Sequence, residues 1–261
     1  MPAEETSSLP APLLEIQGLT KFFGGLRAVG DLTMNVRQGE LAGLIGPNGA
    51  GKTTLFNLIT GILKPDSGSV TFENENITGL PHYVICKKGM SRSFQVVNVF
   101  QRRSVFENVQ VSVLARENKT WKLFTPSYKL MREETERILE SVGLTKKRDA
   151  ISGALSHGDR KVLEIAMALG GEPRFLILDE PTAGMSLEET LRCIDLIKQL
   201  SEKMGLTILF CEHDMELVFS ISNRIMVMVR GATIIQGSCE DVRCNAAVQD
   251  AYLGGSDVCL M

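Results

Sequence analysis

The amino-terminal part of the chain alternates short apolar runs with polar, glycine-containing turns. Apolar runs of this length, bounded by such turns, are typical of β-strands. The strands predicted in this part are Leu14–Leu19, Leu26–Val36, Leu41–Ile45, Ser69–Glu73 and Met90–Phe94. A helix-compatible stretch at residues 52–62, ended by Gly61 and the downstream Pro65, lies between the third and fourth of them.

The pattern changes in the middle of the chain. Val105–Leu114 and Ser127–Val142 carry apolar residues at helical spacing. Strand patterns are hard to find between Val96 and Ser156. We interpret residues 96–158 as a helical insertion between two halves of an α/β core.

Alternating strands and helices return in the carboxyl-terminal part, which favours a parallel sheet with helices on its faces. The predicted helices here are Arg160–Leu169 and Leu187–Ser201, and the predicted strands are Phe175–Leu178, Leu206–Cys211 and Arg224–Val229. A hairpin joined at Gly231 is expected to end the sheet with a strand at Ala232–Gln236. The fold class predicted from these patterns is α/β.

Composition limits the classes of protein that this chain can represent. Its 261 residues include 44% apolar and 23% charged residues, as in ordinary globular proteins. We expect one domain over residues 13–254, a disordered lead at 1–12 and a short tail at 255–261. The net charge is −3 without a dominant basic block, so we expect no nucleic-acid partner.

The sequence also argues against export and membrane insertion. No apolar stretch approaches the length of a membrane-spanning helix. The amino terminus lacks the basic start and apolar centre of a signal peptide, so we expect a cytoplasmic chain. Its six cysteines include no Cys-x-x-Cys pair, which favours reduced thiols over disulfides or a zinc site.

Residues 46–54 read Gly-Pro-Asn-Gly-Ala-Gly-Lys-Thr-Thr, which is the P-loop pattern between a predicted strand and a predicted helix. Glycines allow a tight turn whose backbone N–H groups point at phosphate oxygens, and the following helix adds the positive end of its dipole. Lys52 is expected to reach the β- and γ-phosphates, and the Thr53 hydroxyl to hold Mg²⁺. A plain glycine turn is the alternative, and the flanking pattern argues against it.

Two further motifs carry candidate chemistry. Asp179 and Glu180 follow the apolar run Phe175–Leu178, so the strand delivers two carboxylates to the edge of the sheet where ligands of α/β proteins bind. The pair is suited to hold Mg²⁺ and to polarise a water molecule, although a helix cap before Pro181 is an alternative. Ser156 precedes a helical run with Gly158 beside it, a setting that caps a helix and binds a terminal phosphate.

The order of these motifs resembles that of the ATP-binding subunits of ABC transporters. The resemblance spans Leu14 to Gly254. The matching motifs are the P-loop Gly46–Thr53, the Q-loop glutamine Gln95, the signature Leu155–Asp159, the acidic pair Asp179 and Glu180, and the switch histidine His213. The resemblance implies a P-loop NTPase with a RecA-like core, an antiparallel β subdomain and a helical subdomain.

Some details resemble the branch that serves branched-chain amino acid importers. The segments in question are Gly24–Val29, Phe56–Gly61, Glu212–Met215 and Tyr252–Gly254. Three residues depart from the general family pattern. His157 and Asp159 stand in the signature where the family usually has glycine and glutamine, and Ser186 stands where it often has aspartate.

The resemblance also implies ligands, partners and residue roles. ATP and Mg²⁺ would be bound, and hydrolysis would energise import of a small solute such as a branched-chain amino acid or a related amino acid or amide. Catalytic roles would fall on Glu180, His213, Gln95 and Lys52, and metal binding on Thr53, Gln95 and Asp179. Nucleotide contacts would come from Phe23, Gly46, Pro47, Asn48, Gly49, Ala50, Gly51, Lys52, Thr53 and Thr54, and from Ser156 and Gly158 of the opposing chain.

The implied partners are a second ATP-binding subunit, identical or not, membrane permease subunits and, indirectly, a solute-binding protein. The chain would then lie at the cytoplasmic face of the inner membrane. A lipid or lipopolysaccharide exporter and a soluble non-transport ABC protein are the alternative functions.

Two of the implied contacts, one with adenine and one with a membrane subunit, can each be assigned to more than one residue. If the strand is extended, Phe22 and Phe23 alternate faces, so we expect Phe22 in the core and Phe23 exposed for stacking on adenine. The segment Val96–Phe106 is expected to form a groove for a short helix of a membrane subunit. Phe100, Val105 and Phe106 would supply its apolar contacts or belong to the internal core.

Overall fold

The structure is a computed structural model that describes residues 12–93, 99–116 and 131–253. Gln95 therefore lies outside the described residues, as do most of the expected lead and the whole expected tail. Among the described residues, none of the helices combines the length and the apolar character that crossing a bilayer requires.

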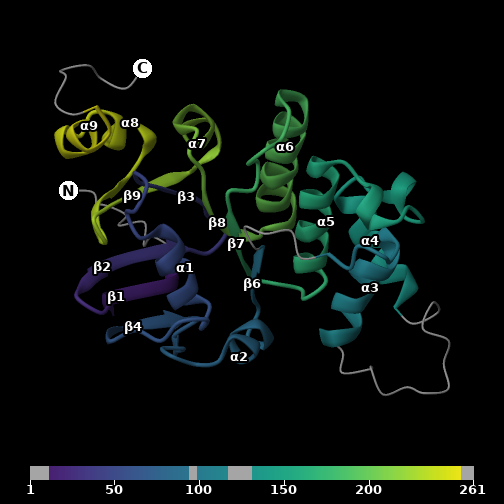
Figure 1. Cartoon of the computed structure of the whole chain (residues 1–261), viewed down its shortest axis with the longest axis horizontal. Coiled ribbons are helices and arrows are strands. Elements are labelled where there is room, and N and C mark those ends of the chain that lie inside the picture. The colour runs from purple at the N-terminus through teal and green to yellow at the C-terminus, as the bar shows by residue number, and fades with distance from the viewer. Residues whose placement is uncertain (1–11, 94–98, 117–130, 254–261) are drawn as a thin grey trace, which may run out of the picture.

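A six-stranded sheet forms the centre of the molecule (Figure 1). Its order is β10 (Ala232–Gly237), β9 (Arg224–Val229), β3 (Leu41–Ile45), β8 (Thr207–Cys211), β7 (Phe175–Asp179) and β6 (Met90–Ser93). All neighbouring strands are parallel except the terminal hairpin of β9 and β10. β3, β7 and β8 are buried along their whole length, which is why each reads as a continuous apolar run.

A second, antiparallel sheet packs beside the first. Its order is β2 (Leu26–Arg37), β1 (Pro12–Phe23), β4 (Ser67–Phe72) and the short β5 (Glu75–Asn76). β1 is longer than the sequence predicts, because it begins at Pro12, a residue that the sequence pattern assigns to the lead. The turn between β1 and β2 lies at Gly24-Gly25, as expected.

Helices cover both sides of the central sheet. They are α1 (Lys52–Ile59), α2 (His82–Lys87), α3 (Val105–Arg116), α4 (Arg132–Ser141), α5 (His157–Leu169), α6 (Leu187–Met204), α7 (Met215–Ile221), α8 (Cys239–Arg243) and α9 (Ala246–Leu253). Figure 1 shows α3, α4 and α5 gathered on one side of the sheet, and β1, β2 and β4 with α1 on the other. The sequence predicts no helix at α2, α7, α8 or α9, which are short and weakly periodic.

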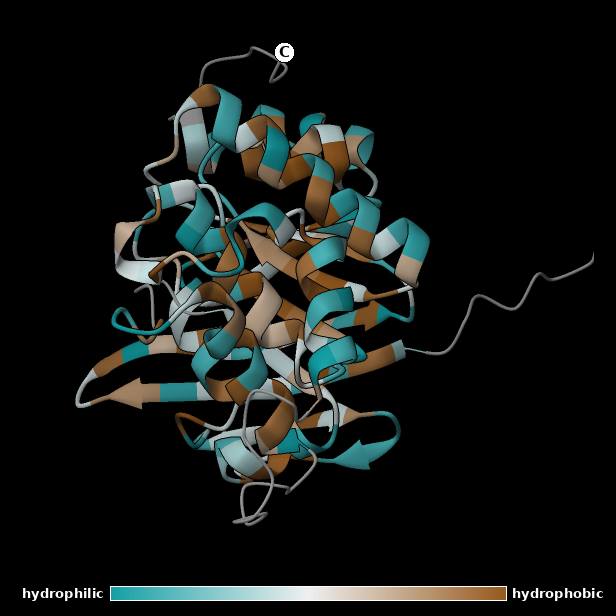
Figure 2. Ribbon diagram, turned by 90° about the vertical axis from the view of Figure 1, so that its right-hand side faces the viewer, coloured by the Kyte–Doolittle hydropathy of each residue, from teal (hydrophilic) through white to brown (hydrophobic). Residues whose placement is uncertain are grey.

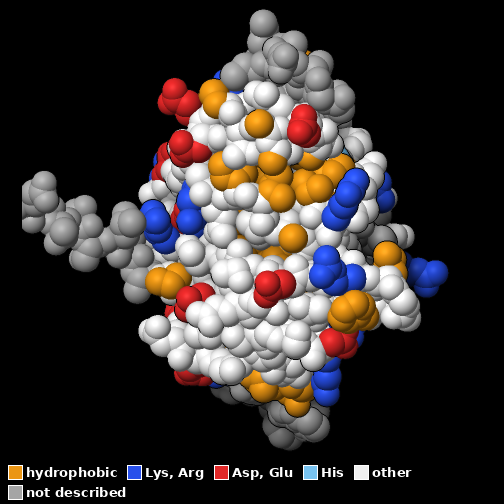
Figure 3. Space-filling model, turned by 90° about the vertical axis from the view of Figure 1, so that its left-hand side faces the viewer, with side chains coloured by type: hydrophobic (Ala, Val, Ile, Leu, Met, Phe, Trp, Pro, Cys, Tyr) orange, Lys and Arg blue, Asp and Glu red, His pale blue; other side chains and the backbone are white. Residues whose placement is uncertain are grey.

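The hydrophobic core has two parts, one on each face of the central sheet. Alternate residues of one strand serve the two parts: Leu178 packs toward α3, α5 and α6, while Ile177 packs toward α1 and the antiparallel sheet. Figure 2 shows the same arrangement as apolar strands enclosed by helices with hydrophilic outer faces. Charged side chains of both signs are interspersed on the face in Figure 3, which does not have the basic stripe of a nucleic-acid-binding surface.

Asn108 ties the helical region to the segment that precedes the signature. This fully buried side chain donates to Ser152 Oγ at 2.6 Å and to the carbonyl of Ser104 at 2.8 Å. Ser152 Oγ in turn donates to the carbonyl of Arg103 at 2.6 Å. Buried amides that make several such bonds fix one arrangement of the chain, so the start of α3 is held against the segment that precedes Ser156.

Burial shows which residues of the expected groove for a membrane-subunit helix belong to the core. Val105 and Phe106 are buried in the core, whereas 52% of Phe100 is exposed. Val105 and Phe106 are therefore core residues, and Phe100 alone of the three is available for an external apolar contact.

Candidate active site

Residues 46–51 connect β3 to α1 at the carboxyl edge of the parallel sheet, and Lys52–Thr54 form the first turn of α1. Gly51 has φ +100°, and a Cβ there would come within 2.4 Å of the carbonyl oxygen of Ala28. Only glycine satisfies both conditions. Gly51 is also the N-cap of α1, and no side chain caps that helix. The first N–H groups of α1 are thus left for a ligand, as anion binding at a helix terminus requires.

Lys52 is held over this loop by the carbonyl groups of the loop itself. Its Nζ donates to the carbonyl of Gly46 at 2.6 Å and to that of Pro47 at 3.3 Å. The side chain is largely buried. The ammonium group therefore sits inside the turn made by the glycines, where it adds a full positive charge to the partial charges of the backbone.

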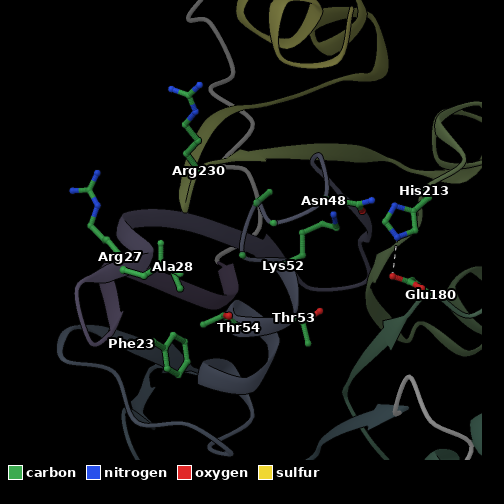
Figure 4. Close-up of a pocket in the computed structure, with 14 residues that line it drawn as sticks. Phe23, Arg27, Ala28, Asn48, Lys52, Thr53, Thr54, Glu180, His213 and Arg230 are labelled. Atoms are coloured by element: carbon green, nitrogen blue, oxygen red, sulfur yellow. Dashed lines mark hydrogen bonds and ion pairs between the residues drawn. The ribbon is translucent and has the colours of Figure 1, made fainter.

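A pocket of about 520 Å³ opens around this loop. Figure 4 shows that its wall comes from three parts of the chain: the β1–β2 hairpin, the P-loop with α1, and the ends of β7, β8 and β9. The predicted residues that line it are Phe23, Asn48, Gly49, Ala50, Gly51, Lys52, Thr53, Thr54, Glu180 and His213. Leu26, Arg27 and Ala28, from the segment Gly24–Val29 that resembles the importer branch, also line it, as does Arg230, which belongs to none of the sequence motifs.

The prediction that one of Phe22 and Phe23 belongs to the core is wrong. The exposed fractions of the two side chains are 46% and 47%. The pairing of β1 with β2 shifts register between Lys21 and Phe22, and such a bulge breaks the two-residue alternation of a strand. Phe23 lines the pocket, with the ammonium of Lys21 6.0 Å from the centre of its ring.

Glu180 and His213 meet on the opposite wall of the pocket. His213 Nε2 lies 2.8 Å from Glu180 Oε1, and Figure 4 shows the two side chains pointing toward each other. Glu180 has φ +49°, a left-handed conformation that residues other than glycine seldom adopt. Its N–H donates to the carbonyl of Cys211 at 3.0 Å, so the end of β8 fixes the turn that presents the carboxylate.

Asp179 lies directly behind this pair and is almost fully buried. Arg92 Nη2 donates to Asp179 Oδ2 at 2.7 Å, and Arg92 Nη1 donates to Asn57 Oδ1 at 2.6 Å. Cys211 Sγ donates to Asp179 Oδ1 at 3.1 Å. Burial, together with the charge of Asp179, raises the pKa of the Cys211 thiol. Arg92 thereby joins β6, the strand that leads to Gln95, to the acidic motif and to α1.

Glu212 supports the same loop from β8. Its Oε1 accepts hydrogen bonds from the N–H of Thr182 at 2.8 Å and from the Thr182 hydroxyl at 2.7 Å. Burial raises the pKa of Glu212, although the bonds from Thr182 act in the opposite direction. The residue that separates the switch histidine from β8 thus anchors the loop that follows Glu180. Neither Arg92 nor Glu212 has a spacing that marks it from sequence alone.

Ser156 and Gly158 lie away from this pocket, at the start of α5. Ser156 is the N-cap of α5, and its Oγ accepts a hydrogen bond from the N–H of Asp159 at 3.2 Å. The residues that depart from the family pattern have partners within the chain. His157 Nε2 lies 3.0 Å from the carbonyl oxygen of Ala183, Asp159 pairs with Lys147, and Ser186 caps α6.

The residues of the pocket suit a hard divalent cation better than a transition metal. The Thr53 hydroxyl, on the wall of the pocket, is an oxygen donor of the kind that Mg²⁺ prefers. The Asp179 carboxylate is not part of the wall, and its two oxygens accept hydrogen bonds from Arg92 and Cys211, so it would reach an ion through water. Within the described ranges there is no group of three or more histidine, cysteine, aspartate or glutamate side chains that could hold a metal ion. The donor set fits an ion that is bound mainly through phosphate oxygens and water.

Comparison with known proteins identifies the relatives of this chain. A family model described as ABC transporter matches residues 29–183. The high-affinity branched-chain amino acid transport ATP-binding protein BraF of Pseudomonas aeruginosa is 40% identical over 250 residues, which cover 93% of this chain and 98% of BraF. LivG of Escherichia coli K12, described in the same words, is 40% identical over 251 residues, with the same coverage.

Solved structures agree with the sequence relatives. The ADP conformation of MJ1267, an ATP-binding cassette of an ABC transporter, has a TM-score of 0.84 and 31% identity, and covers 94% of this chain and 100% of its own. MJ0796, a bacterial ABC transporter cassette solved as a dimer, has a TM-score of 0.74 at 23% identity, covering 87% and 98%. The predicted fold class, with its parallel and antiparallel sheets, is confirmed.

The buried pair of Arg92 and Asp179 generates a stability prediction. Arg92→Met leaves a carboxylate that is 1% exposed without this cation, and we expect a loss of about 3–5 kcal/mol in the free energy of unfolding. The double variant Arg92→Met/Asp179→Asn should lose clearly less than the sum of the two single variants. Urea unfolding monitored by circular dichroism measures all three.

Arg103→Met is the matched control, because the ion pair of Arg103 with Glu107 is exposed and is expected to contribute less than about 1 kcal/mol. Strict additivity of the Arg92 and Asp179 variants would show that the two side chains are not energetically coupled.

Proposed function

This chain belongs to the ABC transporter family, and we propose that it is the ATPase subunit that energises import of a small solute through a membrane transporter. The solute class that the relatives favour is branched-chain amino acids or related amino acids and amides. BraF and LivG are both described as branched-chain amino acid transport proteins. Their names favour this function over lipid export and over a soluble non-transport role.

The observation that carries the proposal is that Glu180 and His213 share one pocket with the P-loop. A nucleotide whose phosphates lie on the N–H groups of the loop would bring its terminal phosphate to Lys52 and Thr53, facing Glu180. Phe23, on the hairpin wall of the same pocket, would stack on the adenine ring. Hydrolysis needs a group that orients a water molecule at the terminal phosphate, and the Glu180 carboxylate, which lines the pocket with the P-loop, would take this role.

His213 would serve as a sensor of the terminal phosphate and would hold Glu180 in place. Its ring nitrogen already lies within hydrogen-bond distance of the carboxylate. Thr53 and Asp179 would hold Mg²⁺, which when bound neutralises charge on the phosphate oxygens. Gln95 would complete the site from the segment that follows β6, because Arg92 ties that strand to Asp179.

The second half of the site would come from another ATP-binding chain. Ser156 and Gly158 lie outside the P-loop pocket of their own chain, and the helix start that they form is suited to contact the phosphate of an opposing chain. MJ0796 was solved as a dimer. ATP would then hold two chains together, and hydrolysis would release them.

This opening and closing would drive permease subunits at the cytoplasmic face of the inner membrane. The exposed ring of Phe100, in the segment after Gln95, would contribute an apolar contact to a permease helix. The permease would in turn receive the solute from a solute-binding protein.

Glu180→Gln tests the hydrolytic role. We expect ATP binding to persist while the rate of phosphate release falls by at least about a hundredfold, because an amide cannot orient and polarise water as a carboxylate does. The measurement is steady-state phosphate release together with nucleotide titration. Glu216→Gln, an exposed carboxylate at the start of α7, is the control and should keep the native rate. Release near the native rate in Glu180→Gln would assign the step to another residue.

Phe23→Ala tests the adenine contact. Loss of base stacking should raise the dissociation constant for ATP by about five- to fiftyfold. Phe22→Ala is a close control, because Phe22 is equally exposed and does not line the pocket. Fluorescence titration with a labelled nucleotide measures both. Equal effects of the two variants would count against stacking on Phe23.

Co-purification tests the transport role. Affinity capture of the chain from membranes solubilised in mild detergent should recover permease subunits, and the solute-binding protein of the same system should bind branched-chain amino acids or related amides in a calorimetric screen. Recovery of ribosomal or DNA-repair proteins in place of permeases would overturn the importer assignment.

A further inference from the structure

The carboxylate of Glu189, in the first turn of α6, reaches across to the start of α5. Its Oε1 accepts a hydrogen bond from the Ser156 hydroxyl at 2.8 Å. Ser156 is the residue of the signature to which the proposed function gives a phosphate contact. The Ser156 hydroxyl therefore already donates its hydrogen bond to a negatively charged group of this chain.

Gly158 shows how closely the carboxylate approaches the start of α5. A Cβ on Gly158 would lie 2.7 Å from both the Cδ and the Oε1 atoms of Glu189. The absence of a side chain at Gly158 is thus what allows the carboxylate to lie against the backbone there. Hydrogen bonds from Ser156, from the backbone of Ser186 and from the backbone of Gly158 hold the pKa of Glu189 below its usual range.

The other oxygen of the same carboxylate caps α6. Glu189 Oε2 accepts from the N–H of Ser186 at 3.1 Å and from its hydroxyl at 3.3 Å, and the N–H of Glu189 donates to Ser186 Oγ at 3.3 Å. This is a capping box. The two oxygens of one carboxylate thus accept hydrogen bonds at the amino termini of two helices, α6 and α5.

We propose that the Glu189 carboxylate takes, on the signature Ser156–Gly158, the place that the terminal phosphate of the opposing chain's ATP takes in the closed pair. This inference rests on the proposed function of Ser156 and Gly158. An anion that binds there must take over the Ser156 hydroxyl and displace Oε1, because two negative groups cannot share these donors. Glu189 is then a positioning residue that raises the ATP concentration needed to close the two chains.

The arrangement makes the displacement reversible. Oε2 and the Ser186 hydroxyl can keep the α6 cap while the carboxylate turns away from Ser156. When the phosphate leaves, the same carboxylate can return and satisfy the donors of α5. The donors of the signature therefore have a hydrogen-bond acceptor both when phosphate is bound and when it is absent.

The test removes the charge of Glu189 and keeps its capping bonds. Glu189→Gln retains an oxygen for Ser186, since glutamine also serves in a capping box. The variant is made in the Glu180→Gln background, so that ATP is not consumed, together with the ATP-binding chain that pairs with this one, either a second copy or a different chain. Sedimentation velocity gives the ATP concentration at which half of the chains are paired.

Glu188→Gln is the matched control. Glu188 lies in the same turn of α6, and its side chain is 84% exposed and forms a loose ion pair with Arg192 at 3.9 Å. We expect Glu189→Gln to pair at about a three- to tenfold lower ATP concentration than its background, and Glu188→Gln to pair as the background does. Binding of labelled ATP to the isolated chain should be equal in all three, because Glu189 does not line the P-loop pocket.

Two other results would contradict the role of Glu189, and only the second of them would also contradict the proposed function. If Glu189→Gln pairs at the same or a higher ATP concentration than Glu188→Gln, Glu189 does not compete with phosphate and the proposal is wrong. If the background binds ATP and never pairs, the signature makes no phosphate contact between chains. That result overturns the proposed function and the role of Glu189 with it.

Discussion

The order of strands in the parallel sheet is the constraint on which the site depends. β3 lies between β8 and β9, and β7 lies beside β8. Because these strands are parallel, their carboxyl ends meet at one edge, so that the P-loop after β3, Glu180 after β7 and His213 after β8 reach a common pocket. Residues that are far apart in sequence thus line one pocket, and the loops after β7 and β8 are also joined directly by the hydrogen bonds from Thr182 to Glu212. A substitution that shifted the register of one of these strands would separate the three motifs from one another.

Buried polar contacts fix the fine position of the carboxylates at this edge. Arg92 and Asp179 form an ion pair with almost no exposure, and Glu212 holds the loop at Thr182. A buried ion pair contributes little net stability compared with apolar packing, so its value here is one of geometry. The same Arg92 guanidinium reaches Asn57 on α1. The P-loop helix, the acidic motif and the strand that leads to Gln95 are consequently linked through one side chain.

The sequence was sufficient for the fold class and the family, because each rests on local patterns, and several of the residues it singles out lie in one pocket with the P-loop. A buried strand followed by glycines, lysine and threonine has few other interpretations, and the apolar runs of β3, β7 and β8 reflect burial on both faces. The prediction for Phe22 failed because a bulge changes the alternation of β1 and leaves no local mark. The roles of Arg92, Glu212 and Glu189 were not predicted for a related reason. The partners that define these roles, Asp179, Thr182 and Ser156, are 30 or more positions away in sequence, so that only the folded chain shows them.

Two of the residues that depart from the family pattern, His157 and Ser186, connect the signature to the loop that follows the acidic motif. An amino-terminal helix end presents N–H donors that lack partners within the helix. If Ser156 and Gly158 contact the ATP of an opposing chain, as proposed above, those donors must be accessible to phosphate and satisfied when phosphate is absent. Ser186 caps α6 and thereby aims the Glu189 carboxylate, while His157 reaches the loop just before Ser186 through the carbonyl of Ala183. The signature and the loop after the acidic motif are joined within one chain by these contacts. An anion that displaced Glu189 from Ser156 would therefore act first on the Ser186 end of the loop that begins with Glu180, because Glu189 bonds to both Ser156 and Ser186.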